Sequence, residues 1–209
     1  MNEPEPIVLV VDDDDSLCRG VERLLRSIGL NVETFVSAQE FMRHPPPQGP
    51  ACLVLDMRMP EMSGLELQQE LVAAGLGLPV IFLTGHGTVP MSVRALKTGA
   101  ADFLQKPVED QVLLDAIHQA LERNRQARAQ EAELMSLRRR ADTLTARERE
   151  VFGLVVTGLA NKEVAAVLGT SEKTVKIHRG RVMQNMQASS LAHLVRMADQ
   201  LGPLTSKPT

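Results

Sequence analysis

Three short, unbroken apolar segments in the first half of the chain constrain its fold more than any other feature. They cover residues 7–11, 52–55 and 80–83. A strand that is apolar at every position must be buried on both faces, which is typical of parallel sheets enclosed by helices. Segments 31–35 and 102–105 complete five predicted strands, and helical patterns alternate with them at 15–28, 37–43, 64–74, 88–98 and 109–122. This alternation predicts a doubly wound α/β fold with a five-stranded parallel sheet.

Acidic, hydroxyl and basic side chains stand where four of these strands end. Residues 12–15 are four aspartates that follow the first strand, and Asp56, Thr84 and Lys106 close or follow the third, fourth and fifth. Each feature has a simpler explanation, because an acidic run can cap a helix and a Lys-Pro pair can form a turn. The carboxyl ends of parallel strands, however, meet at one edge of the sheet. Polar residues at four strand ends therefore indicate a common site.

The residue types at these strand ends favour phosphoryl chemistry. Asp13 and Asp56 offer the oxygen ligands that a hard divalent cation, Mg²⁺ or Mn²⁺, prefers. Such a cation neutralises charge on an incoming phosphoryl group, so a carboxylate can act as the nucleophile. Lys106 adds a second positive charge, and the Thr84 hydroxyl can donate a hydrogen bond to a phosphoryl oxygen.

Charge is distributed unevenly along the 209 residues. Residues 1–122 carry 18 acidic and 8 basic side chains, and residues 123–209 carry 8 acidic and 15 basic ones, so the two parts have net charges of −10 and +7. This division indicates a cation as partner of the first part and a polyanion as partner of the second. No segment has the pattern of a membrane span or a signal peptide. Cys18 and Cys52 are expected to be buried thiols of a cytoplasmic protein rather than a disulfide or a redox switch.

One long helix is predicted over residues 109–142, which contain neither Pro nor Gly. Leu113 and Ile117 would pack its first half on the sheet, whereas beyond residue 123 the apolar stripe thins. Residues 123–137 are therefore predicted to form a solvated linker helix. A dimeric coiled coil is the alternative, but its seam would then hold Asn124, Glu131 and Arg138.

The last part of the chain is predicted to be all-helical. Thr145 and Glu148 have the spacing of a capping box, and helices are expected at 146–157, 161–168, 172–186 and 190–200. On a helical wheel for 172–186, one face is apolar and the opposite face is polar and basic. The apolar face carries Val175, Val182 and Met186, and the opposite face includes Lys173, Lys176 and Ile177.

A basic face on the second helix of a helix-turn-helix is suited to the major groove of DNA, although a solvated basic face is the alternative. His178 lies nearer the apolar side and is interpreted as a hydrogen-bonded structural histidine.

Residues 7–122 resemble the receiver domains of two-component response regulators. The resemblance rests on VVDD at 10–13, LDMRMP at 55–60 with SG at 63–64, LTG at 83–85 and KP at 106–107. It implies a flavodoxin-like fold in which a sensor histidine kinase phosphorylates Asp56. It also implies that Mg²⁺ is held by Asp12, Asp13, Asp56 and the backbone carbonyl of Arg58. Thr84 and Lys106 would hold the phosphoryl group, Phe103 would take the place of the switch aromatic, and the Lys106–Pro107 peptide would be cis.

Residues 138–203 resemble the DNA-binding domains of the LuxR/FixJ (NarL-like) family. The carrying segments are LTAREREV at 144–151, Gly158, NKEVA at 161–165 and TVKIH at 174–178, and VPM at 89–91 with SLAHLVR at 190–196 is similar to FixJ-type regulators. The resemblance implies a helix-turn-helix from Asn161 to Gly180. Expected DNA contacts are Lys173, Thr174, Lys176, Ile177, Arg179 and Arg181.

These observations predict a transcriptional response regulator and not an enzyme. Its parts would be a receiver at 1–122, a linker helix at 123–137, a DNA-binding domain at 138–203 and a tail at 204–209. Expected partners are a sensor histidine kinase, promoter DNA and RNA polymerase, with a homodimer formed on phosphorylation. An aspartate-nucleophile phosphohydrolase would use the same residue types, but the loops are too short for its cap insertion. That alternative, like a receiver without an output, also leaves the basic helix-turn-helix unexplained.

Overall fold

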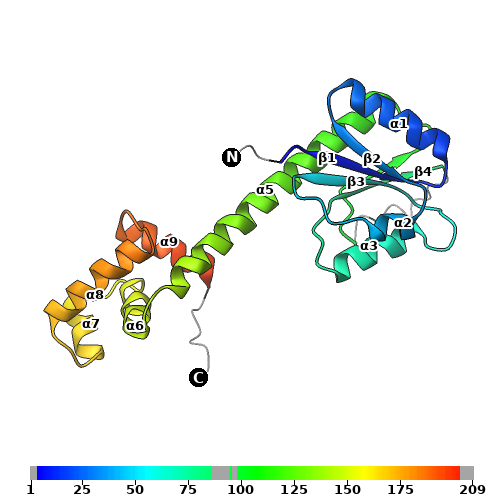
Figure 1. Ribbon diagram of the computed structural model, residues 1–209. Helices are drawn as coiled ribbons and strands as arrows, with labels where there is room; N and C mark the ends of the chain where they lie inside the picture. Colours follow the sequence, from blue (N-terminus) through cyan, green and yellow to red (C-terminus); the bar gives the residue numbers. More distant parts are fainter. Residues whose placement is uncertain (1–3, 86–94, 96–97, 203–209) are drawn as a thin grey trace. The chain divides into compact units, whose positions relative to one another are not determined.

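The computed structural model describes residues 4–85, 95 and 98–202 of the chain. The chain divides into two compact units, Met1–Arg128 and Ala129–Thr209, and each is described by itself (Figure 1). Apart from Ala95 and Thr98, the helix predicted over 88–98 lies outside the described residues.

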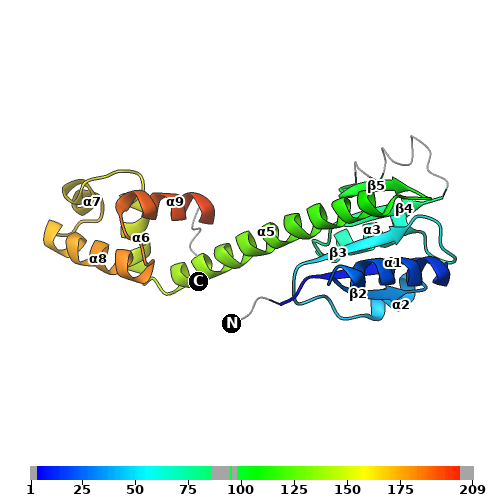
Figure 2. The same cartoon turned by 90° about the horizontal axis from the view of Figure 1, so that it is seen from above.

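Five parallel strands form the sheet of the first unit, in the order β2-β1-β3-β4-β5. The strands are β1 Ile7–Val11, β2 Asn31–Phe35, β3 Ala51–Asp56, β4 Val80–Thr84 and β5 Asp102–Gln105. The helices described around them are α1 Asp15–Ser27, α2 Ala38–Arg43, α3 Gly64–Ala73 and the N-terminal part of α5 Asp110–Asp142. One face of the sheet is covered by α1 and α5 and the other by α2 and α3 (Figures 1 and 2). The predicted doubly wound fold is confirmed.

Alternate residues of each strand enter two separate cores. In β1, Val8 and Val10 pack toward α1 and α5, whereas Leu9 and Val11 pack toward α2 and α3. All four residues are fully or almost fully buried. Because both faces of the strand are covered, neither set of positions can be polar without losing hydrogen bonds to water. This double burial explains the unbroken apolar segments of the sequence.

The turn after β3 depends on a glycine at the start of α3. A Cβ atom placed on Gly64 would lie 2.2 Å from the backbone oxygen of Asp56 and 3.1 Å from side-chain atoms of Leu55 and Phe82. The side chain of Ser63 caps α3 and forms a capping box with Glu66. The helix therefore begins directly against the end of β3, which only a residue without a side chain permits.

The second unit is an all-helical core built on the C-terminal part of α5. Its other helices are α6 Ala146–Val155, α7 Asn161–Val167, α8 Glu172–Asn185 and α9 Leu191–Leu201. Leu137 of α5, Phe152 of α6 and Leu194 of α9 are among the side chains buried in this core. The capping box predicted for Thr145 and Glu148 begins α6.

Replacing Gly64 should destabilise the first unit. We expect Gly64→Ala to lower its free energy of unfolding by about 1–3 kcal/mol, because the added methyl overlaps the backbone of β3. Gly20→Ala in α1 is the matched control, since nothing lies within 4 Å of its added Cβ and alanine favours a helix by about 1 kcal/mol. Native-state hydrogen exchange of the β3 amides measures both changes. Equal stabilisation by the two substitutions would contradict the close approach.

Candidate functional site

The carboxyl ends of four neighbouring strands bring the candidate site residues together. Asp12 follows β1, Asp56 is the last residue of β3, Thr84 is the last residue of β4, and Lys106 follows β5. The strands run parallel, and Asp56 is in register with Leu83 while Thr84 is in register with Gln105. The Lys106 backbone N–H donates to the Thr84 carbonyl at 2.8 Å, and the Lys106–Pro107 peptide is cis.

The ammonium group of Lys106 joins two buried carboxylates. Its Nζ lies 2.6 Å from Oδ2 of Asp12 and 2.7 Å from Oδ1 of Asp56. Asp12 is 2% exposed and Asp56 is 6% exposed, so both acids are almost withdrawn from water. Buried carboxylates are tolerated where an opposite charge and hydrogen bonds compensate them. Lys106 supplies that compensation for both acids at once.

Burial and pairing act in opposite directions on the pKa values at this site. Burial raises the pKa of Asp12 above its ordinary value, and the hydrogen bonds from Lys106 and from the Asp14 N–H offset only part of that rise. Burial lowers the pKa of Lys106, but its hydrogen bonds to Asp12 and Asp56 outweigh this and leave the pKa raised. Lys106 is therefore charged at neutral pH.

The second oxygen of each carboxylate accepts a backbone hydrogen bond. Oδ1 of Asp12 accepts from the Asp14 N–H at 2.9 Å, and Oδ2 of Asp56 accepts from the Arg58 N–H at 2.6 Å. Asp13, by contrast, is exposed. Both orienting bonds come from the turns that follow the strands, so these turns fix how the acids face each other.

Thr84 and Phe103 lie on the neighbouring strands. Thr84 is 1% exposed at the end of β4. Phe103, on β5, is half-buried, and its ring centroid lies 6.5 Å from that of Phe82 with the planes tilted by 45°. The structure thus brings Asp12, Asp56, Thr84 and Lys106 to one edge of the sheet, with Phe103 beside them.

The donor set at this edge fits a hard divalent cation. Within the described residues, no group of three or more His, Cys, Asp or Glu side chains could by itself enclose a metal ion. Mg²⁺ does not require such a group, because it is often held by one or two carboxylates and keeps several waters or phosphate oxygens. The converging oxygens of Asp12 and Asp56 meet that requirement.

The two cysteines lie outside this chemistry. Both are buried free thiols, as expected from the sequence. Burial raises the pKa of Cys18 to about 11 and that of Cys52 to about 12. Neither thiol is ionised at neutral pH, so neither is an activated nucleophile.

A second candidate site is the exposed face of α8. The predicted core positions Val175, Val182 and Met186 are all buried. On the opposite face Lys173 and Lys176 are exposed, and Ile177 is 50% exposed. Neither lysine forms an ion pair within the described part of the chain. The helix thus presents unpaired positive charge and one apolar side chain to the surroundings.

Two contacts that the sequence did not indicate hold α8 in place. Arg179 Nη1 donates to Asn161 Oδ1 at 3.0 Å, which ties α8 to the start of α7. Glu148, 3% exposed at the start of α6, accepts from Asn185 Nδ2 at 3.5 Å. Thr174 lies in the first turn of α8, and its hydroxyl is 2.8 Å from that of Ser171, the N-cap residue. These contacts leave the exposed face of α8 to Lys173, Lys176, Ile177 and Arg181.

The interpretation of His178 as a hydrogen-bonded residue is wrong for one of its nitrogens. Nδ1 of His178 is buried and has no hydrogen-bond partner among the described residues. The residue as a whole is half-buried, and a helical wheel does not show whether a partner lies within reach of its ring.

No helix among residues 4–85 and 98–202 combines the length and the apolar character that crossing a bilayer requires.

Comparison with known proteins identifies both units. Residues 8–118 match the response regulator receiver domain, and residues 142–198 match the bacterial regulatory proteins of the luxR family. The chain is 51% identical to nodulation protein W of Bradyrhizobium diazoefficiens over 94% of its own length and 86% of that protein. Among solved structures it is similar to the response regulator StyR, with 48% identity, a TM-score of 0.86 and coverage of 94% of this chain and 100% of that one.

Full-length FixJ from B. japonicum is a further similar structure, with 38% identity, a TM-score of 0.58 and coverage of 98% of this chain and 100% of that one. Receiver and luxR-type regions therefore occur together in one chain and in the same order as in these relatives. The protein belongs to the two-component response regulators that join a receiver domain to a luxR-family DNA-binding domain and regulate transcription.

Proposed function

We propose that Asp56 is the phosphoacceptor, that a sensor histidine kinase supplies the phosphoryl group, and that phosphorylation controls DNA binding by α8. The observation that carries this proposal is the position of Lys106 Nζ, within 2.7 Å of a carboxylate oxygen of both Asp12 and Asp56. An acid pair and an ammonium at one sheet edge provide a nucleophile together with charge that opposes the phosphoryl oxygens.

In the transfer, an Asp56 oxygen attacks the phosphorus of a phosphohistidine. An O–P bond forms as the N–P bond breaks, and the electron pair of the broken bond stays on the imidazole nitrogen. Lys106 already reaches Asp56, so its ammonium needs only a short movement to donate to the new phosphoryl group. The Thr84 hydroxyl donates to another phosphoryl oxygen.

Asp12, Asp13, Asp56 and the Arg58 backbone carbonyl would hold Mg²⁺ or Mn²⁺. When bound, the cation neutralises charge on the phosphoryl oxygens and on the acids around them. Asp12 is fixed for this task by the Asp14 N–H, whereas the exposed Asp13 is free to orient toward the ion.

One route by which the signal leaves the site runs through Thr84 and Phe103 to the dimer-forming face. When Thr84 moves toward the phosphoryl group, it leaves space beside β5. Phe103, which lies on β5, then turns inward. Phe103 has no hydroxyl group, so this change is expressed through packing alone, and the altered face favours a homodimer. RNA polymerase is the further partner of the DNA-bound dimer in the cytoplasm.

On DNA, α8 lies in the major groove. Lys173, Lys176 and Ile177 contact bases from the middle of the exposed face. Arg181, at the border of that face, and the half-buried Thr174 and Arg179 contact the phosphate backbone. The functional regions are a receiver at 1–122, a linker helix at 123–137 and a DNA-binding domain at 138–203, followed by a tail at 204–209. The helix-turn-helix runs from Asn161 to Gly180.

Asp56 should be the only residue that accepts a phosphoryl group. Incubation with acetyl phosphate and Mg²⁺ is expected to add one phosphate to the protein, as intact mass spectrometry will show, and alkali should remove it because acyl phosphates hydrolyse. Asp56→Asn should add none. Asp14→Asn is the matched control: asparagine also caps helices well, so labelling should persist. Phosphate on the Asp56→Asn protein would overturn the assignment.

Lys176 should discriminate between DNA sequences. On a promoter fragment mapped by immunoprecipitation, Lys176→Ala is expected to weaken binding by about 1–3 kcal/mol, and to weaken binding to random DNA much less. Lys162→Ala, an exposed lysine on α7, should reduce both affinities alike, as a phosphate contact does. Equal losses on both DNAs for Lys176→Ala would assign Lys176 to the backbone instead of the bases.

A further inference from the structure

The inner face of α5 changes character along its length. Leu113, Ile117 and Leu121 follow one another at intervals of four residues, and all are buried against the sheet. The next positions on the same face are Asn124 and Arg128. The inner face of the helix thus becomes polar after Leu121, in a segment that the sequence predicts to be a solvated linker.

Asn124 bonds to the start of β3 and to the segment that precedes β4. Its Oδ1 accepts from the backbone N–H of Ala51, the first residue of β3, at 3.0 Å. Its Nδ2 donates to the carbonyl of Gly77, in the segment before β4, at 2.9 Å. Asn124 is 5% exposed, and its bond to the Ala51 N–H is shielded from water, whereas Gly77 is exposed. Loss of this amide would leave a buried donor and a carbonyl without their partner.

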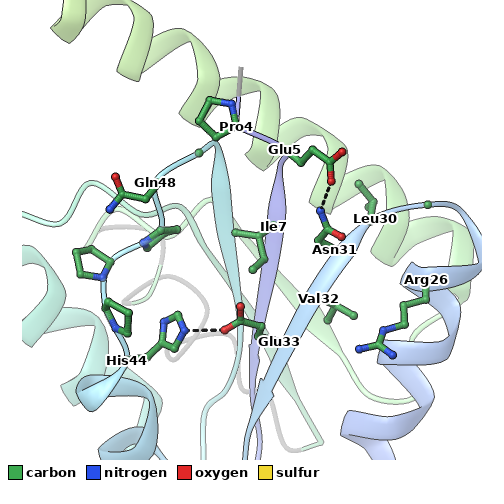
Figure 3. A pocket seen from close by; sticks show the side chains of 15 residues that line it. Pro4, Glu5, Ile7, Arg26, Leu30, Asn31, Val32, Glu33, His44 and Gln48 are labelled. Atoms are coloured by element: carbon green, nitrogen blue, oxygen red, sulfur yellow. Dashed lines mark hydrogen bonds and ion pairs between the residues drawn. The ribbon is translucent and has the colours of Figure 1, made fainter. Parts of the chain in front are cut away.

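Arg128 extends the attachment to the segment that precedes β3. Its Nη2 donates to the carbonyl of Gln48 at 2.6 Å. The Pro45–Gly49 stretch and the starts of β1 and β2 line a cleft of about 790 Å³, with Ile7 of β1 among the lining side chains (Figure 3). Within the cleft His44 pairs with Glu33, and Asn31 donates to Glu5. A Cβ on Gly49 would lie 2.8 Å from the Glu5 carbonyl, so the segment held by Arg128 also packs tightly on the residues that precede β1.

Nothing on α5 is buried for some distance after this attachment. Residues 125–133 are all exposed, and the next buried side chain is Leu137, in the core of the second unit. Arg128 is also the last residue of the first unit. Asn124 and Arg128 are therefore where the helix is fixed on the receiver side.

We propose that Asn124 and Arg128 are positioning residues that fix where α5 leaves the receiver, and that they carry the state of Asp56 to the DNA-binding domain. β3 connects the two places directly: its first residue bonds to Asn124 and its last is Asp56. All six residues of β3 are buried, so the strand has little freedom to absorb a displacement. The signalling part of this inference rests on the proposed phosphorylation of Asp56.

The anchor is tested first by hydrogen exchange on the full-length protein. Asn124→Leu keeps a side chain of similar size without hydrogen-bonding groups, and the Ala51 amide should exchange at least about tenfold faster. Arg125→Ala is the matched control, because this neighbour is exposed and pairs with Glu122. It should leave the Ala51 amide unchanged. An Ala51 amide that stays equally protected in Asn124→Leu would overturn the anchor.

The signalling role is tested by the ratio of DNA affinities with and without acetyl phosphate. Arg128→Ala removes an exposed side chain, so the fold is retained, and one phosphate per chain should still be added. The phosphorylation-dependent gain in affinity should fall by about threefold or more, and Arg128→Lys, which keeps a long side chain with a charged donor, should restore it. Arg125→Ala should retain the full gain.

The outcomes separate this inference from the proposed function. An undiminished gain in both Arg128→Ala and Asn124→Leu would overturn the signalling role of the anchor while leaving Asp56 as the phosphoacceptor. A wild-type protein that is phosphorylated without any gain in DNA affinity would overturn the proposed function, and the signalling role with it.

Discussion

The ion cluster of Asp12, Asp56 and Lys106 sets the strictest geometric requirement on the first unit. Two carboxylates that are at most 6% exposed require compensating charge, and here one ammonium reaches both. That ammonium follows β5, two strands away from β3, so β4 must lie between them in fixed parallel register. The buried strands supply this rigidity, because their side chains are close-packed in two cores, one on each face of the sheet. The packing of the hydrophobic core therefore fixes the positions of the charged groups at the edge of the sheet.

Much of this arrangement could be predicted because it depends on local patterns. Three unbroken apolar segments predicted β1, β3 and β4, and two more polar segments between helical patterns completed the five strands. The capping box of Thr145 and Glu148 located the start of α6. The α8 face could be assigned for the same reason, since 3.6 residues per turn fix which side chains share a side. Placing the acids, Thr84 and Lys106 at one edge required only the rule that parallel strands end together.

The remaining site features depend on partners distant in sequence or on local orientation. Nothing in the run of four aspartates indicates which one turns inward, and the structure places Asp12 against Lys106 while Asp13 is exposed. Asn124 was assigned to a solvated linker because it is polar. Its partners are backbone groups 73 and 47 residues away, and side-chain patterns do not show which backbone groups lack a partner. The bond from Arg179 to Asn161 joins two side chains 18 residues apart, and helical spacing alone does not show that they meet.

In the exposed part of α5, the helix forms for one physical reason and is attached to the receiver for another. Residues 125–133 bury no side chain, so tertiary packing does not hold them in a helix. Starting a helix is costly whereas extending one is not, and here packed turns exist on both sides, around Leu121 and around Leu137. The intervening Ala, Glu, Gln and Arg residues are strong helix formers and need only to propagate what these turns begin. Helicity is therefore intrinsic to this stretch, whereas the point from which it leaves the sheet depends on the bonds of Asn124 and Arg128.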